Sequence, residues 1–104
     1  MPRSVKKYED SLSGSLKNPT EAAAYLNSHL ADNESDSEEL FLMALRDVAK
    51  AYGVADVAEK AQLGRESLYK ALSSDGNPKL ATLRTLLKAM GLKLAVEVDK
   101  KAAS

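Results

Sequence analysis

The sequence lacks cysteine and tryptophan and contains a single phenylalanine. The absence of cysteine excludes disulfide bonds and thiolate metal sites, and it gives no indication of an oxidising compartment. Because large aromatic side chains are scarce, any hydrophobic core must be built mainly from Leu, Ala and Val. With 44% hydrophobic and 29% charged residues in 104 positions, the chain is predicted to form one small, helix-rich domain with loose ends.

Long apolar runs are also missing. No segment approaches the roughly 20 apolar residues that a membrane-spanning helix needs. The first seven residues are basic, but no apolar segment follows them as it would in a signal peptide. We therefore expect a cytoplasmic protein with no membrane partner.

The residue patterns that carry enzyme chemistry are absent. His29 is the only histidine, and no pair of carboxylates accompanies it. No glycine-rich loop precedes a strand, and no spacing of His, Asp and Glu is typical of a metal site. The sequence therefore predicts neither an enzyme nor a cofactor, and no catalytic or metal-binding residue.

The net charge of zero conceals an uneven distribution. Residues 1–43 hold four basic and eight acidic side chains, whereas residues 44–93 hold nine basic and five acidic ones. A basic region behind an acidic forepart suits a protein with two partners, one of them polyanionic. Chance variation of surface charge is the alternative explanation.

The central motif is predicted at residues 54–72, where two short amphipathic helices flank a tight turn. Val57, Ala58 and Ala61 give the first helix an apolar face, and Leu68 and Leu72 continue it on the second. The second helix presents five polar side chains outward: Arg65, Glu66, Ser67, Tyr69 and Lys70. A helix of this length fits the major groove of DNA, so the motif predicts a DNA-binding helix-turn-helix.

Three further helices are expected around this motif. Asn18 and Pro19 form a cap-plus-proline start for a helix that runs to about Leu30. A second helix begins with a capping box near 35–39 and stops at Gly53. A third starts after Asn77-Pro78 and stops at Gly91.

The two ends differ from this helical centre. Residues 1–17 are predicted to be a flexible arm, although Tyr8, Leu12 and Leu16 form one stripe of a helix that could order on a partner. Residues 92–98 alternate apolar and other side chains, which indicates a half-buried β-strand that must pair outside its own chain. An irregular extended tail packed on the domain is the alternative. Residues 99–104 are expected to fray.

These features resemble a known family. The run 64–73, the Gly76-Asn77-Pro78 turn and residues 83–94 are similar to the antidotes (antitoxins) of HigA-like type II addiction modules. The match continues upstream through residues 24–27 and 44–49, so the resemblance covers roughly residues 8–96. The resemblance implies a fold of the Cro/lambda-repressor class: all-α, with about five helices. The predicted domain spans residues 18–98 and includes the short C-terminal β-strand at 92–98.

The resemblance also implies a function. Such a protein is a homodimer that binds double-stranded operator DNA at an inverted repeat, represses its own operon and neutralises a co-encoded RelE/ParE-like toxin. The operator-facing residues are then the same five of the second motif helix. The expected phosphate contacts come from five positions: Gln62, Ser74, Asn77, Lys79 and Arg46. The acidic forepart is the candidate toxin contact, because such toxins are generally basic.

Two positions depart from the family pattern. Gln62 stands where glycine is usual in the turn and must adopt a left-handed conformation or reshape the turn. Gly64 replaces the frequent Ser cap and is a weaker cap. Two alternatives stay open: a stand-alone phage-type repressor without a toxin, and an interaction module that has lost DNA binding.

Overall fold

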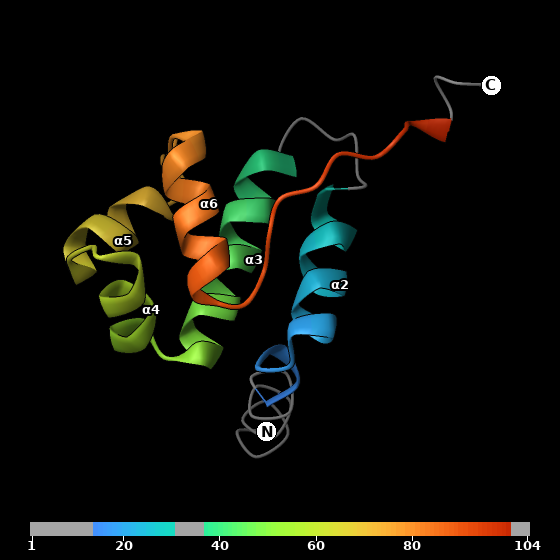
Figure 1. Cartoon of the computed structure of the whole chain (residues 1–104). Helices are drawn as coiled ribbons and strands as arrows, with labels where there is room; N and C mark the ends of the chain where they lie inside the picture. Colours follow the sequence, from blue (N-terminus) through green and yellow to red (C-terminus); the bar gives the residue numbers. More distant parts are fainter. Residues whose placement is uncertain (1–13, 31–36, 101–104) are drawn as a thin grey trace, which may run out of the picture.

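The computed structural model describes residues 14–30 and 37–100, and within these ranges all regular secondary structure is helical. Figure 1 shows how the helices pack around one another. Their bounds are α2 (Pro19–Leu30), α3 (Ser37–Tyr52), α4 (Val54–Ala61), α5 (Arg65–Ala71) and α6 (Leu80–Ala89). The all-α class predicted from the sequence is therefore confirmed for the described residues. None of these helices is long and apolar enough to cross a membrane.

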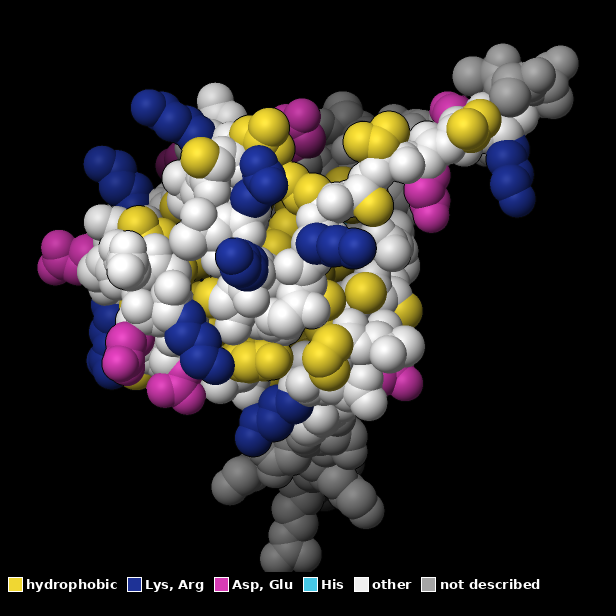
Figure 2. All heavy atoms as spheres, viewed as in Figure 1, with side chains coloured by type: hydrophobic (Ala, Val, Ile, Leu, Met, Phe, Trp, Pro, Cys, Tyr) yellow, Lys and Arg dark blue, Asp and Glu magenta, His cyan; other side chains and the backbone are white. Residues whose placement is uncertain are grey.

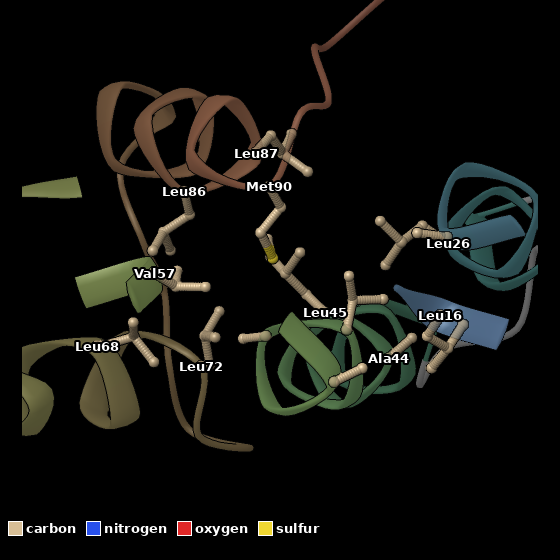
Figure 3. Close-up of a cluster of buried hydrophobic side chains, with 14 of the residues drawn as sticks. Leu16, Leu26, Ala44, Leu45, Val57, Leu68, Leu72, Leu86, Leu87 and Met90 are labelled. Carbon is tan, nitrogen blue, oxygen red and sulfur yellow. The ribbon is translucent and has the colours of Figure 1, made fainter. Parts of the chain in front are cut away.

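The core is made of aliphatic side chains, as the scarcity of aromatic residues predicted. Leu45 and Val48 of α3 are fully buried, and α4 contacts α3, α5 and α6 around them. In Figure 3, side chains from α3, α4, α5 and α6 point toward one another, with Met90 at the end of α6 among them. Complete burial of one such Leu is worth roughly 1.5–3 kcal/mol, so this cluster is the main force that holds α4 and α5 in place.

Helix α2 begins at the cap predicted from the sequence. The Asn18 side-chain oxygen accepts hydrogen bonds from the backbone N–H groups of Thr20 (2.9 Å) and Glu21 (3.4 Å). Pro19 opens the helix, where its missing N–H is not needed. The second predicted capping box rests on Ser35 and Asp36, which lie outside the described residues.

Helices α2 and α3 pack side by side and are joined by a polar contact. The Tyr25 hydroxyl donates a hydrogen bond of 2.9 Å to Oδ2 of Asp47. Leu16, which the sequence analysis counted in the N-terminal arm, is only 2% exposed and packs in the core next to this pair of helices. Tyr8 and Leu12, the rest of the predicted stripe, lie outside the described residues.

Glycines end α3 and α6, as predicted. Gly53 follows α3 with a φ of 111°, and Gly91 follows α6 with a φ of 77°. At the end of α6 the Leu92 N–H donates to the Leu87 carbonyl (2.7 Å) and the Gly91 N–H to the Lys88 carbonyl (3.0 Å). This is the Schellman arrangement, in which a left-handed residue lets the chain leave the helix while its last carbonyls remain bonded.

The predicted C-terminal strand is wrong for the isolated chain. Residues 92–99 are extended but form no strand, and they leave α6 to run past α3 and α2 and away from the helices (Figure 1). The alternating pattern was read correctly as extended backbone. A strand also needs a neighbouring strand for its backbone groups, however, and the described part of the chain contains none.

Candidate nucleic-acid interface

The turn between α4 and α5 is a Schellman motif built on a residue other than glycine. Gln62 has φ 57° and ψ 41°, in the left-handed region, which is the first of the two outcomes that the sequence left open at this position. Its N–H donates to the Glu59 carbonyl (3.1 Å), and the Leu63 N–H donates to the Ala58 carbonyl (2.9 Å). These two bonds fix the exit from α4, so the architecture keeps its usual turn and Gln62 bears the conformational cost.

Helix α5 starts without a side-chain cap. Gly64 is the N-cap residue, with extended backbone angles, and its carbonyl accepts the first helical bond from the Leu68 N–H (3.0 Å). A Cβ atom built on Gly64 would meet nothing within 4 Å. The position therefore has room for a capping Ser or Asp that the sequence does not supply.

Helix α5 is divided into a buried and an exposed side. Leu68 is fully buried among the core side chains, and Leu72, directly after the helix, is buried equally well (Figure 3). The opposite side carries five exposed side chains, including Tyr69, which is 45% exposed although it is aromatic. They are the base-facing candidates of the sequence analysis: Arg65, Glu66, Ser67, Tyr69 and Lys70. The described residues thus leave this face of α5 open.

A shallow groove of about 540 Å³ lies between α5 and the loop that leads to α6. Ser67 and Lys70 line it from α5, and Asn77 lines it from the loop. Three residues predicted to contact DNA are thus brought to one surface from two separate segments. The expected contact residues Gln62, Ser74 and Lys79 are also exposed.

Gly76 permits the loop to fold back against α5. A Cβ atom at this position would collide with the backbone carbonyl oxygen of Ala71. The Gly76 N–H also donates a 2.8 Å bond to the Ser73 carbonyl, which closes the turn after α5. Only a residue without a side chain fits there, so Gly76 sets the position of Asn77 relative to Lys70.

Lys79 is the N-cap residue of α6. Its carbonyl accepts the Leu83 N–H (3.0 Å), and the first turn of α6 contains no acidic residue. The free N–H groups of that turn therefore carry their positive partial charge without a carboxylate beside them. This end of α6 and the Lys79 ammonium group form a basic margin next to the groove.

Arg46 has a contact that the sequence did not predict. Its Nε and Nη2 atoms both donate to the Leu72 carbonyl at the end of α5, at 3.2 and 2.8 Å, and the side chain is half-buried. A guanidinium group at a helix C-terminus satisfies an orphan carbonyl and opposes the negative end of the helix dipole. In this structure Arg46 holds the end of α5, and its predicted phosphate contact stays a prediction.

Comparison with known proteins decides the family. Residues 5–98 match the family described as probable addiction module antidote proteins. The chain belongs to this family. A relative from Haemophilus influenzae, described as an uncharacterized protein, is 40% identical over 87 residues, which is 84% of this chain and 87% of the relative. No solved structure matches the chain.

This antidote protein has a second basic surface that the sequence analysis did not single out. Arg84 and Lys88 lie one turn apart on α6 and, together with Lys93, line a shallow groove of about 560 Å³ next to the tail. In Figure 2 the Lys and Arg side chains gather over the part of the molecule where α4, α5 and α6 lie. The spacing of four residues between Arg84 and Lys88 was the signal in the sequence that could have predicted this surface. A test of DNA binding must therefore distinguish the α5 surface from the α6 surface.

Proposed function

We propose that this antidote protein binds operator DNA through α4 and α5, represses its own operon and neutralises a co-encoded toxin of the RelE/ParE-like kind. The observation that carries the DNA-binding part is the two-sided character of α5. Leu68, on the apolar side of α5, is fully buried, while the polar side chains face solvent along the whole helix. A helix anchored in this way can enter the major groove without rearrangement, which reduces the entropic cost of binding.

The base-reading chemistry is assigned to the first turns of α5. Arg65 can donate two hydrogen bonds to O6 and N7 of a guanine, which is the commonest specific contact in the major groove. Glu66 can accept from N4 of a cytosine, and Ser67 can bond to either kind of base edge. Tyr69 and Lys70 lie further along the same side and can reach bases or the flanking backbone.

The phosphate contacts are assigned to the residues that surround α5. Lys70 and Asn77 share one groove, and Lys79 stands at the amino end of α6. Gln62, Ser74 and the remaining N–H groups of Arg46 are the weaker candidates. Each phosphate that the protein neutralises steepens the salt dependence, with a slope of about −0.9 per contact.

The toxin contact is assigned to the acidic forepart of the chain. Glu21, Glu38 and Glu39 are exposed on the first turns of α2 and α3, which supports an acidic surface there. A basic toxin would be attracted to this surface and would leave the basic α5 surface free. The family description, probable addiction module antidote protein, supports a toxin partner but does not name its target.

DNA binding is tested by gel shift with a duplex that covers the region upstream of the protein's own gene. We expect a shift that requires an inverted repeat, with half-sites about one DNA turn apart because a dimer presents two α5 helices. Toxin binding is tested separately, by co-purification with the product of the adjacent gene. A DNA shift without any such product would favour a stand-alone repressor, and co-purification without a shift would favour a pure interaction module.

A further inference from the structure

The groove beside α6, which we call the α6 groove, is lined by charged side chains of one sign only. These are Arg84 and Lys88 of α6 and Lys93 at the start of the tail. By contrast, the groove beside α5 and the two grooves that Leu30 lines each contain an acidic side chain. Figure 2 shows Lys and Arg side chains close together over α6 and the start of the tail, with no Asp or Glu side chain among them. The α6 groove is therefore a local concentration of positive charge.

The three cations have no partner within the described part of the chain. None of them makes an ion pair or a side-chain hydrogen bond with a described residue. They are not needed to cap α6 either, because its last carbonyls already accept the backbone N–H groups of the following turn. Like charges four residues apart on a helix, such as Arg84 and Lys88, weaken it slightly. A ligand of opposite charge would explain why they are gathered here.

The turn after α6 brings the tail back beside the helix. Gly91 has a left-handed φ of 77°, and a Cβ atom there would lie 3.6 Å from the Tyr52 hydroxyl oxygen, so the turn favours glycine. Beyond this turn, the N–H groups of Lys93 and Leu94 make no backbone hydrogen bond with the described residues. Both residues line the α6 groove. Unpaired backbone N–H groups next to cationic side chains are the donors that phosphate oxygens accept.

We propose that the α6 groove binds a ligand with two or more linked phosphates, either a nucleotide or an inorganic polyphosphate. Linked phosphates concentrate several negative charges in a small volume, which matches three cations around one groove of about 560 Å³. The Arg84 guanidinium can donate to two oxygens of one phosphate, and the two lysines can neutralise the next one. Leu92 and Leu94 supply an apolar wall that can cover the base of a nucleotide.

A short chain of phosphates suits the α6 groove better than a DNA duplex does. A duplex spreads its phosphates along a convex surface, where projecting side chains such as those of α5 meet them. The α6 groove is hollow instead, and it shares no lining residue with the groove beside α5. The proposed site is thus separate from the proposed operator contact, and each can be tested without the other.

Titration of the isotope-labelled full-length chain with pyrophosphate, followed by NMR, tests the site. We expect saturating shifts at Arg84, Lys88 and Lys93 and little change at Lys70 and Asn77 of the groove beside α5. Orthophosphate at the same ionic strength should bind about tenfold more weakly, because a single phosphate offers fewer charges and oxygens to the three cations.

ADP distinguishes the two sources of linked phosphates. Tighter binding of ADP than of pyrophosphate would show that the apolar wall holds a nucleoside, and the ligand would be a nucleotide. Equal or weaker binding of ADP would show that the phosphates alone are recognised, and the ligand would be an inorganic polyphosphate.

Removal of the cations tests their part in binding. Lys93→Gln should weaken pyrophosphate binding by about fivefold, the upper end for a solvent-exposed ion pair, and Arg84→Gln/Lys88→Gln by about 25-fold. The matched control Lys17→Gln/Lys50→Gln removes two charges from positions that line none of these grooves, and it should change the affinity by less than about twofold. All five positions are exposed, so circular dichroism should be unchanged.

Four results would overturn the proposal. Shifts confined to the α5 surface would place the anion elsewhere, and an equal loss in the control variant would reduce the effect to general attraction. Equal affinity for orthophosphate and pyrophosphate would mean that linked phosphates are not recognised. Displacement of pyrophosphate from the α6 groove by a duplex of unrelated sequence would assign the groove to nucleic acid. The first three results would leave the operator contact of α5 unaffected.

Discussion

Gln62 accepts an unfavourable backbone conformation so that the chain can turn between two closely packed helices. The left-handed region costs a residue with a side chain roughly 1–2 kcal/mol, and glycine avoids this cost. Since the turn bonds to Ala58 and Glu59 are both formed, the strain does not alter the turn itself. The packing of the hydrophobic core therefore offsets the conformational cost at Gln62. The Gln62 side chain itself is exposed, so it is available for contact with a phosphate.

We expect Gln62→Gly to stabilise the free protein by about 0.5–1 kcal/mol, which is the relief of strain minus the greater flexibility of glycine in the unfolded chain. Urea unfolding monitored by circular dichroism measures this change. Gln62→Ala is the matched control, because it removes the same side chain and keeps the backbone cost. Equal stability of the Gly and Ala variants would contradict the strain argument.

Gly64 is the opposite case. Its backbone has the extended conformation of an N-cap residue, but it has no side chain that could accept a hydrogen bond from the start of α5. Gly64→Ser should place a hydroxyl where it accepts the free N–H groups of the first turn of α5. Compared with Gly64→Ala, which restricts the unfolded chain similarly but has no oxygen, the Ser variant should be more stable by about 1 kcal/mol. Thermal and urea unfolding of the pair would show this difference, and an Ala variant as stable as the Ser variant would refute the cap.

Helix boundaries could be predicted from the sequence because their causes are local. Asn18-Pro19, Gly53 and Gly91 each act within a few residues, and α2, α3 and α6 begin or end at these signals. The contact of Arg46 with Leu72 could not be predicted, because the two residues are 26 positions apart and no periodicity links them. The tail strand was wrong for a related reason: alternation is a local property, but pairing depends on another segment.

The candidate site was predictable to the same extent. The exposed side of α5 follows from where Leu68 and Leu72 fall, and both are buried as expected. The meeting of Lys70 and Asn77 in one groove depends on the close approach of Gly76 to Ala71, which no spacing rule describes. Residue types and faces were thus accessible from the sequence, and the relative placement of α5 and the following loop was not.

At the scale of elements, Arg46 connects α3 to the end of α5. We expect Arg46→Met, which keeps much of the aliphatic stem, to lower the free energy of unfolding by about 1.5 kcal/mol, near the lower end for bonds to a charged donor because the group is half-exposed. Lys50→Met, one turn further along α3 and exposed, is the control and should change stability by less than about 0.5 kcal/mol. Equal losses in both variants would contradict the capping role.

The same variant separates capping from phosphate binding. If Arg46 also contacts a phosphate, Arg46→Met should reduce the slope of log Kd against log salt by about 0.9. An unchanged slope, together with the loss of stability, would leave Arg46 with the structural role alone.

At the scale of the whole molecule, charge is sorted along the chain. Acidic side chains dominate residues 1–43 and basic ones residues 44–93. Among the basic residues, Lys70 lines the groove beside α5, whereas Arg84 and Lys88 line a separate groove on α6. Long-range attraction to DNA depends on this total charge, whereas specific binding depends on which surface enters the groove. Removing the same number of charges from α5 or from α6 should therefore change the net charge equally but change specific DNA binding differently.

The central claim is that the exposed side of α5 contacts operator DNA, and fluorescence anisotropy with the upstream duplex at moderate salt tests it most directly. Arg65→Ala/Lys70→Ala should weaken binding by about 30-fold, which corresponds to about 2 kcal/mol, since a bidentate base contact is worth roughly 1–3 kcal/mol and a phosphate contact adds to it. The control Arg84→Ala/Lys88→Ala removes the same two charges from α6 and should weaken binding only a few-fold. Unchanged affinity in the α5 variant, with the loss transferred to the α6 variant, would contradict the account.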